Sequence, residues 1–228
     1  MEKRRDSATA YIILADGFET IEALTPLDVL RRCGVEVTTI SLNKTRAVRS
    51  SHGVTVEADA TMEDFMHNCN CCASGTGTGT NSSIAGSSTS ASDTNTTAST
   101  STNVSGTMRQ ALILPGGYPG YKNLCESAEV GALITQFHKE GKLLCAICGA
   151  PTALKANQIC RGAAITCHTS VKEELSDYYS ILSSAVVKYM NIITGMGAGR
   201  SLEFAFAIAE ALTSKEKVEE IKAKMEII

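Results

Sequence analysis

The sequence lacks the features that mark several large classes of protein. None of its apolar runs approaches the roughly 20 residues that a membrane-spanning helix requires. The N-terminal segment 1–9 is charged and polar without an apolar stretch, so we expect no secretory signal there. Basic residues are not in excess, because 21 Lys and Arg stand against 24 Asp and Glu. Lys3, Arg4 and Arg5 form the only short basic cluster. The composition therefore disfavours binding through phosphates, and we expect a cytoplasmic protein with no membrane partner and no sequence-specific nucleic-acid partner.

Motifs for common cofactors are also missing. Gly116 and Gly117 follow a predicted strand, but the chain has neither a GxxxxGK[ST] loop nor, at residues 195–199, the GxGxxG spacing. We therefore expect no nucleotide cofactor. His67, Cys69, Cys71 and Cys72 could hold a soft metal, but their spacing does not match a standard zinc site. A thiol-rich tract without metal is the interpretation we prefer.

One segment differs in composition from the rest of the chain. Residues 73–107 contain 10 Ser and 10 Thr and a single charged residue, Asp93. Such a segment cannot bury a core, so we expect it to be disordered and exposed. The remaining residues suffice for one well-filled domain, so we expect residues 1–228 to form a single domain that contains this insert.

Outside the insert, strand-like and helix-like spacing of apolar residues alternate. Predicted strands lie at 11–15, 35–42, 111–114, 143–147, 163–167, 186–189 and 191–194, with a hairpin at 47–58. Predicted helices lie at 19–33, 129–140, 149–157, 170–175, 201–212 and after Thr213. Ser170 with Glu173, and Thr213 with Glu216, have the spacing of helix caps. This order predicts an α/β protein with a mostly parallel sheet covered on both faces, and ligands that bind beyond the carboxyl ends of the strands.

Cys148 is the strongest candidate for a reactive group. It follows the predicted strand 143–147 where the chain enters a helix with almost no loop, which is the geometry of a nucleophile elbow. A helix N-terminus at this place would stabilise a thiolate and lower the pKa of the thiol. The alternative is a buried cysteine without a chemical role, and the spacing leaves both open. Cys145 and Cys148 also form a C-x-x-C motif, but Cys145 is expected to point into the sheet, which disfavours a dithiol redox pair.

Five segments, in the expected order, carry a resemblance to a known family. They are LADGFETIEALTPLDVLRRCGVEVT, LILPGGYPGYKNL, AICGAPTAL, ITCH and TGMGAGRSLEFAFAIAEAL. Together they span nearly all of the chain outside the insert, and they resemble the ThiJ/PfpI superfamily, more narrowly its DJ-one (parkinsonism-associated deglycase) branch. The resemblance implies a flavodoxin-like three-layer α/β sandwich, similar to class I glutamine amidotransferases, that forms a homodimer. His52 and Arg32 would then lie near the dimer interface.

The resemblance also implies a site and an activity. It assigns the reactive cysteine to Cys148, a carboxyl partner to Glu22, a nearby histidine to His168, and oxyanion-type backbone amides to Gly117 and Gly149. The implied activity is that of a glutathione-independent glyoxalase or protein deglycase. Its substrates would be 2-oxoaldehydes such as methylglyoxal and glyoxal, or their early adducts with amines and thiols, and it would need no metal or organic cofactor. The alternatives are an oxidative-stress sensor or redox-regulated chaperone that uses the same cysteine, and a dimeric scaffold whose partner binds the insert.

The physical chemistry of these residue types is consistent with such roles. A carboxyl group held against a thiolate should have a raised pKa, so Glu22 would stay protonated and later move protons on the substrate. Glu19 lies three positions earlier and is the second candidate for this role. His168 would polarise a carbonyl or relay a proton. Protease-like relatives carry a histidine directly after the nucleophile, where this chain has Gly149, so a peptidase dyad is not expected.

Overall fold

The computed structural model describes residues 8–68 and 110–227. The predicted Ser/Thr-rich insert at 73–107 therefore lies outside the described residues, and so do Cys69, Cys71 and Cys72. Within the described part of the chain, no group of three or more His, Cys, Asp or Glu side chains is placed so that it could hold a metal ion. None of the helices in those two ranges combines the length and the apolar character needed to cross a membrane.

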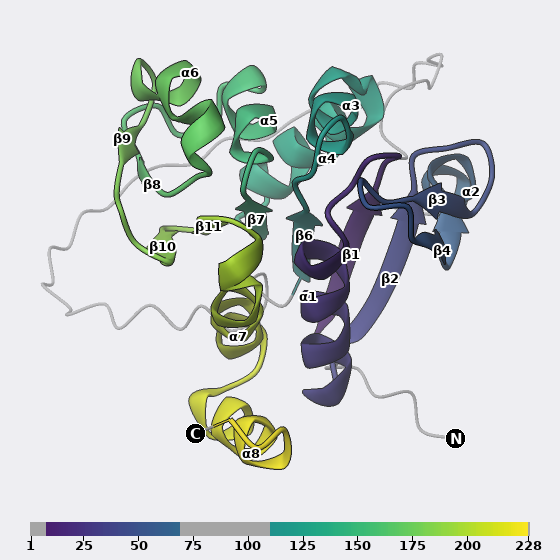
Figure 1. Ribbon diagram of the computed structural model, residues 1–228, viewed down its shortest axis with the longest axis vertical. Helices are drawn as coiled ribbons and strands as arrows, with labels where there is room; N and C mark the ends of the chain where they lie inside the picture. The colour runs from purple at the N-terminus through teal and green to yellow at the C-terminus, as the bar shows by residue number, and fades with distance from the viewer. Residues whose placement is uncertain (1–7, 69–109, 228) are drawn as a thin grey trace, which may run out of the picture.

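A seven-stranded sheet forms the centre of the described structure (Figure 1). Its strands, in spatial order, are β10 (Val186–Tyr189), β11 (Ile192–Gly195), β7 (Leu143–Ile147), β6 (Gln110–Leu114), β1 (Thr9–Leu14), β2 (Glu36–Ser41) and β5 (Ala60–Thr61). Neighbouring strands are parallel except for β10 and β11, which pair antiparallel. Two small sheets flank it, formed by β3 (Ala47–Arg49) with β4 (Thr55–Glu57) and by β8 (Ala164–Ile165) with β9 (Ser180–Ile181).

Helices cover both faces of the central sheet, so the predicted three-layer, mostly parallel α/β sandwich is confirmed. One layer contains α1 (Thr20–Arg32), α7 (Ser201–Leu212) and α8 (Lys215–Lys224). The other contains α2 (Met62–Asn68), α3 (Gly120–Glu126), α4 (Ala128–Lys139), α5 (Pro151–Ala156) and α6 (Lys172–Ser176). Helices α1 and α7 lie side by side and contact each other along their length (Figure 1).

The core is divided by the sheet because successive strand residues point to opposite faces. In β1, Ile12 packs against the layer of α1 and α7, whereas Ile13 packs against the layer of α4 and α5. In β7, Cys145 packs against the layer of α1 and α7, and Leu144 packs against the layer of α4 and α5. Every residue of β7 is buried, which explains why this strand is an unbroken apolar run in the sequence.

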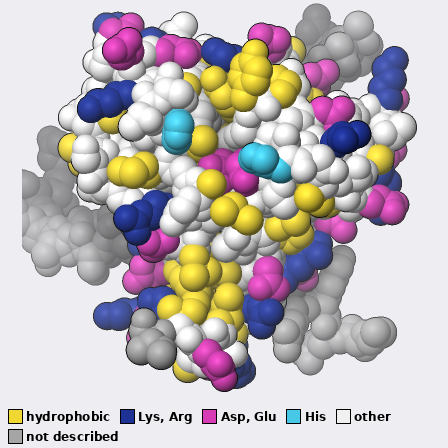
Figure 2. All heavy atoms as spheres, in the orientation of Figure 1, with side chains coloured by type: hydrophobic (Ala, Val, Ile, Leu, Met, Phe, Trp, Pro, Cys, Tyr) yellow, Lys and Arg dark blue, Asp and Glu magenta, His cyan; other side chains and the backbone are white. Residues whose placement is uncertain are grey.

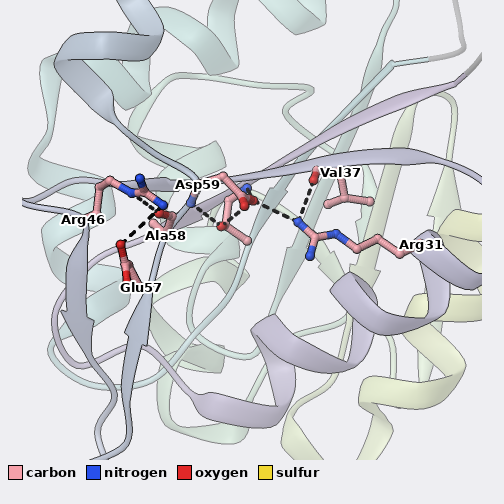
Figure 3. Close-up of polar contacts among 7 residues, drawn as sticks. Arg31, Val37, Arg46, Glu57, Ala58 and Asp59 are labelled. Atoms are coloured by element: carbon pink, nitrogen blue, oxygen red, sulfur yellow. Dashed lines mark hydrogen bonds and ion pairs between the residues drawn. The ribbon is translucent and has the colours of Figure 1, made fainter.

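A polar cluster fastens the C-terminal end of α1 to the sheet (Figure 3). The Arg31 guanidinium lies 2.9 Å from the Asp59 carboxylate and donates to the Val37 carbonyl at 3.0 Å. The Thr39 N–H and hydroxyl both donate to Asp59 at 2.8 Å. Burial alone would raise the pKa of Asp59, but the hydrogen bonds from Thr39 and the charge of Arg31 outweigh it and lower that pKa. The cluster therefore fixes one end of the helix that carries Glu22 at its other end.

The predicted strand 163–167 is wrong in length and in position. Only Ala164–Ile165 forms a strand, and it pairs with β9 rather than with the central sheet. The next residue, Thr166, donates its N–H to the Thr194 hydroxyl at 2.9 Å instead of continuing a ladder. The Thr166 N–H thus bonds to a side chain of β11, and two residues later the His168 N–H donates to the carbonyl of Cys148, which follows β7.

The predicted capping box of Ser170 with Glu173 is also wrong. The Ser170 N–H instead donates to the His168 ring nitrogen Nδ1 at 3.2 Å, and the Ser170 hydroxyl lies 2.8 Å from the same atom. His168 therefore caps a short 3₁₀ turn (Thr169–Val171), and α6 begins without a side-chain cap. Because the Ser170 hydroxyl is bound to the ring of His168, it does not cap the start of α6.

The predicted cap of the last helix is displaced by one residue. Ser214, not Thr213, caps α8, because the Ser214 hydroxyl accepts the Lys217 N–H at 3.2 Å. Thr213 is instead the C-cap of α7, and its N–H and hydroxyl both donate to the Ala209 carbonyl, at 2.9 and 2.7 Å. Because the two helices are so close in sequence, one hydroxyl residue lies at the end of α7 and the next one caps the start of α8.

Phe204 gives a test of this packing. Its ring is fully buried on α7, and a Cβ atom at Gly195 would lie only 3.0 Å from the ring atom Cδ2. We expect Phe204→Ala to lower the free energy of unfolding by about 3–5 kcal/mol, because it leaves a cavity against the central sheet. Urea unfolding monitored by circular dichroism measures this change. Leu182→Ala is the control, since Leu182 is 41% exposed, and an equal loss in both variants would contradict the packing.

Candidate active site

Cys148 lies at a sharp turn between β7 and α5. Its φ is 66°, in the left-handed region that a residue with a Cβ atom rarely adopts. The Cys148 N–H donates to the Gly195 carbonyl at 3.0 Å, and the Cys148 carbonyl accepts the His168 N–H at 2.9 Å. These two bonds hold the strained backbone in place, as the predicted nucleophile elbow requires. The turn exposes part of the cysteine side chain at the carboxyl end of the sheet.

The sulfur does not lie at the start of a helix, so the predicted reason for an activated thiol is wrong. Helix α5 begins at Pro151, two residues later than expected, and consists of only six residues. The backbone N–H groups that act on the sulfur are those of Gly117 and Gly149, and both lower the pKa of the thiol. The family resemblance assigns these same two glycines as oxyanion-type amides, and in the structure both of them hydrogen-bond to the sulfur.

Glu22 reaches the same place from the first turn of α1. Its side chain is fully buried, and its Oε2 atom accepts the Gly116 N–H at 2.8 Å. Its Oε1 atom is buried and has no hydrogen-bond partner among the described residues. Glu19 is not an equivalent of Glu22, because its carboxylate caps α1 and accepts the N–H groups of Ile21 at 2.7 Å and of Glu22 at 3.4 Å. Glu19 therefore fixes the start of the helix and so orients Glu22 toward the sulfur.

Gly116 lies where the side chains of Glu22 and Cys148 meet. A Cβ atom on Gly116 would lie 2.7 Å from the Glu22 Oε2 atom, 2.7 Å from the Cys148 Cβ atom and 3.1 Å from the Cys148 sulfur. No side chain fits there, so this residue is a glycine because the carboxyl and the thiol occupy its space. From the sequence, Gly116 was a candidate only for a phosphate loop, and its position just beyond a predicted strand was the available signal.

Two further glycines allow the surrounding loops to converge. Gly117 has a φ of 89°, and a Cβ atom there would lie 2.3 Å from the Glu19 backbone nitrogen. A Cβ atom on Gly149 would lie 2.7 Å from the ring of Tyr121. The site therefore combines three loops that follow β1, β6 and β7, in agreement with the expectation that function lies beyond the carboxyl ends of the strands.

The burial of the site changes the titration of both side chains. Burial raises the pKa of Glu22 from 4.5 to about 7, the Gly116 N–H and the Cys148 thiol oppose this rise, and the negative charge of Glu19 adds to it. The predicted direction is confirmed, but the main cause is burial rather than repulsion by a thiolate. Burial, together with the charge and hydrogen bond of Glu22, also raises the pKa of Cys148 to about 12, although the two glycine amides oppose this rise. The predicted lowering of the thiol pKa is therefore wrong.

These shifts define which group carries the proton at neutral pH. The Cys148 thiol keeps its proton, whereas the Glu22 carboxyl titrates near pH 7. A carboxylate with this pKa, held against a thiol, is matched to act as a general base at neutral pH. The arrangement can thus form a nucleophile by proton transfer from sulfur to carboxylate at the moment of attack, without a standing thiolate.

His168 contributes its backbone to the site, and its ring lies at the surface. The ring nitrogen Nδ1 is bound to Ser170, and the ring lies next to Gly197, where a Cβ atom would be 3.5 Å from the His168 Cδ2 atom. Figure 2 shows two histidine side chains on this face of the molecule, with acidic side-chain atoms between them. Another described histidine, His52, has its ring nitrogen Nδ1 3.8 Å from the Glu19 carboxylate, a contact that no sequence motif indicated.

Cys145 is excluded as a redox partner of Cys148. Its side chain is fully buried in the layer between the sheet and α1 with α7. Burial alone raises the pKa of this thiol far above its ordinary range. A dithiol pair needs both sulfurs accessible together, so the C-x-x-C motif here reflects the alternation of a buried strand.

The raised pKa of Glu22 predicts a pH-dependent stability. Between about pH 4.5 and pH 7 the folded protein binds a proton that the unfolded chain has released, so the stability falls as pH rises through this window. We expect Glu22→Gln to remove this pH-dependent loss. The free energy of unfolding of the variant minus that of the original protein should therefore rise by about 3 kcal/mol between pH 4.5 and pH 8. Urea unfolding at several pH values measures the difference. Glu63→Gln, at an exposed position of α2, is the matched control, and an identical pH response in both variants would refute the assignment.

The sequence is similar to proteins from several organisms. Protein dj-1beta of Drosophila melanogaster is 32% identical over 216 residues, which cover 94% of this chain and 95% of that protein. The glutathione-independent glyoxalase DJR-1.2 of Caenorhabditis elegans is 39% identical over 107 residues, which cover 46% of this chain and 56% of that protein. The structure is similar to the crystal structure of Drosophila melanogaster DJ-1beta, with a TM-score of 0.77 at 31% identity, covering 97% of this chain and 99% of the other.

The model of the DJ-1/PfpI family matches residues 8–211, which is most of the chain. The sheet order, the two helical layers and the structural neighbour agree with a flavodoxin-like fold of the class I glutamine amidotransferase type. The chain therefore belongs to the DJ-1/PfpI family.

Proposed function

We propose that this chain is a cysteine-dependent glyoxalase or deglycase. It would convert 2-oxoaldehydes such as methylglyoxal and glyoxal, or their early adducts with amines and thiols, to hydroxy acids. One observation carries the proposal: a fully buried Glu22 carboxyl with a pKa near 7 lies against the Cys148 thiol, beside two backbone amides. The family includes a protein named as a glutathione-independent glyoxalase, which supports this class of reaction.

The first step is the addition of sulfur to the aldehyde. The Glu22 carboxylate takes the proton of the Cys148 thiol while the sulfur bonds to the aldehyde carbon, and it then gives this proton to the new alkoxide oxygen. The product is a hemithioacetal. The Gly117 and Gly149 amides act on the sulfur, so they also lie close to an oxygen on the carbon bonded to it. An adduct enters by exchange, in which the sulfur replaces the amine or thiol and that group leaves with a proton.

The second step moves a proton between two carbons. The Glu22 carboxylate removes the hydrogen of the hemithioacetal carbon as a proton, which gives an ene-diolate, and returns this proton to the neighbouring carbon. The hydroxyl proton on the first carbon moves to the oxygen of the second carbon, so the first carbon becomes a carbonyl. The result is a hydroxyacyl thioester of Cys148. Water then hydrolyses the thioester, releases the hydroxy acid and restores the thiol. The sequence of steps is redox-neutral overall, and His168 would assist by polarising the second carbonyl from the surface of the site.

The second candidate function is that of a redox sensor or redox-regulated chaperone. It is favoured by the Glu22 Oε1 atom, which is buried without a hydrogen-bond partner. A protonated Glu22 could donate to an oxygen atom bound to the Cys148 sulfur, and the two glycine amides would stabilise the resulting sulfinate. A homodimer and a cytoplasmic location also belong to this proposal. Exposed aliphatic side chains of Ile21 and Val54 support a dimer, since their burial would be favourable.

Substitution of the two central side chains tests the enzyme. We expect Cys148→Ser to abolish the formation of lactate from methylglyoxal, because a serine hydroxyl is a far weaker nucleophile. We expect Glu22→Gln to lower kcat by a factor of about 100 or more, since an amide cannot accept the thiol proton. Lactate is measured enzymatically in each case.

Cys125→Ser is the matched control, because Cys125 is a half-buried free thiol outside the site. Full turnover by Cys148→Ser would refute the enzymatic mechanism. Negligible turnover of the original protein, with stoichiometric oxygen uptake at Cys148 after mild peroxide in intact-mass spectra, would favour the sensor.

Gly116 offers a test that changes no reactive group. We expect Gly116→Ala to lower kcat by a factor of about 10 or more, because the new methyl group forces the Glu22 carboxyl and the Cys148 thiol apart. The loss of folding free energy should be about 1–3 kcal/mol from overpacking. Gly199→Ala is the control, since a Cβ atom there meets nothing within 4 Å. Unchanged turnover in Gly116→Ala would show that the contact does not matter for the reaction.

A further inference from the structure

A second thiol lies beside a histidine outside the candidate active site. Cys160, in the loop between α5 and β8, places its sulfur 3.8 Å from the Nε2 atom of His138 in the last turn of α4. Both side chains are half-buried, and both come from the layer of helices on the far side of the sheet from α1. A cysteine next to an imidazole is the arrangement that activates a sulfur nucleophile.

The position of the proton on the His138 ring determines whether Nε2 donates a hydrogen bond to the Cys160 sulfur or accepts one from it. The Nδ1 atom of His138 is buried and has no hydrogen-bond partner among the described residues. A buried N–H without an acceptor is rarer and more costly than an unused lone pair, so the proton belongs on Nε2. The Nε2–H group then donates to the Cys160 sulfur, and a donor aimed at sulfur stabilises the thiolate more than the thiol. Burial raises the pKa of Cys160, so the Nε2–H group of His138 is the contact that would favour the thiolate against this burial.

The loop holds Cys160 in a conformation that favours glycine. Its φ is 48°, and Gln158, two residues earlier, has a φ of 56°. The Cys160 carbonyl accepts the Ala163 N–H at 3.0 Å, and the Gly162 N–H donates to the Tyr178 carbonyl at 2.8 Å. These bonds hold the strained turn, so the direction of the sulfur toward His138 is set by the loop.

Basic residues adjoin both members of this contact in the sequence, and one of them, Arg161, also acts on the Asp177 carboxylate. Arg161 and Lys139, which follow the two residues in the sequence, are exposed and basic. The Arg161 guanidinium lies 5.5 Å above the ring of Tyr178, next to the loop. Positive charges at an accessible thiol attract anionic reagents.

We propose that Cys160 and His138 form a second, thiol-modification site that exchanges with small anionic disulfides, independently of Cys148. The Cys160 thiolate attacks one sulfur of the disulfide, the S–S bond breaks, and a mixed disulfide forms with Cys160. The other half leaves as a thiolate that takes up the proton which Cys160 released to solvent. One disulfide is consumed and one is formed, so no further oxidant is required.

Peptide mapping after exposure of the full chain to glutathione disulfide tests this site. We expect Cys160 to form the mixed disulfide at least about tenfold faster than Cys125. Cys125 is the internal control because it is also free and half-buried and also has a pKa raised by burial, but its sulfur lies 3.9 Å from the Thr152 carbonyl instead of a histidine. Equal rates at the two cysteines would overturn the proposal.

Substitution of the histidine separates activation from simple access. We expect His138→Phe to slow labelling of Cys160 about tenfold and to leave labelling of Cys125 unchanged, because an aromatic ring still covers the site but the Nε2–H donor is lost. An unchanged rate at Cys160 would refute the role of His138.

Loss of folding in His138→Phe would be recognised because Cys125 would then react quickly as well. In that case the variant Cys160→Gly tests whether Cys160 is the fast-reacting thiol. Glycine suits the left-handed backbone there. The fast phase must disappear in that variant, and its persistence would overturn the proposal. Hydroxyethyl disulfide, which is uncharged, should react more slowly than glutathione disulfide, and an equal rate would refute the selection by charge.

Discussion

The contact between the Glu22 carboxyl and the Cys148 thiol, both packed over the bare Cα atom of Gly116, is the interaction on which the rest of the site depends. A fully buried carboxyl with one hydrogen bond from a backbone amide is unfavourable when ionised, which moves its titration to about pH 7. The same burial keeps the proton on the sulfur. The pair therefore has a base of suitable strength and a nucleophile that is formed only when that base accepts its proton.

This unfavourable arrangement persists because the surrounding fold holds it from several directions. Glu19 caps the start of α1, and the cluster of Arg31 and Asp59 fastens its other end, so Glu22 cannot turn away to solvent. The loop after β6 can approach the start of α1 only because Gly117 has no side chain. The left-handed turn at Cys148 is bonded to neighbouring chain segments on both sides. The stability of the sheet and its helices thus supports local strain at the carboxyl ends of the strands.

Comparison of the cysteines shows that environment, not residue type, determines their chemistry. Cys145 and Cys148 are three residues apart, yet one is sealed in the core and the other faces a carboxyl and two amides. Cys160 lies in a different loop, also with a left-handed backbone, and has a histidine as its partner. A carboxylate that accepts a proton and an imidazole that donates one suit different reactions, which is why we propose turnover at Cys148 and disulfide exchange at Cys160.

The sequence by itself determined the alternation of strands and helices, the turn at Cys148 and the position of Glu22 at the start of a helix, because apolar periodicity and strand-to-helix junctions are local properties. It did not determine the start of α5, the cap of α8 or the short β8, since each depends on which neighbour takes a particular hydrogen bond. Only the tertiary structure decided the direction of the Cys148 pKa and the role of Gly116. Glu22 and Gly116 are 94 residues apart in the chain, and both burial and electrostatic interaction depend on distance in space, which no local pattern of residues contains.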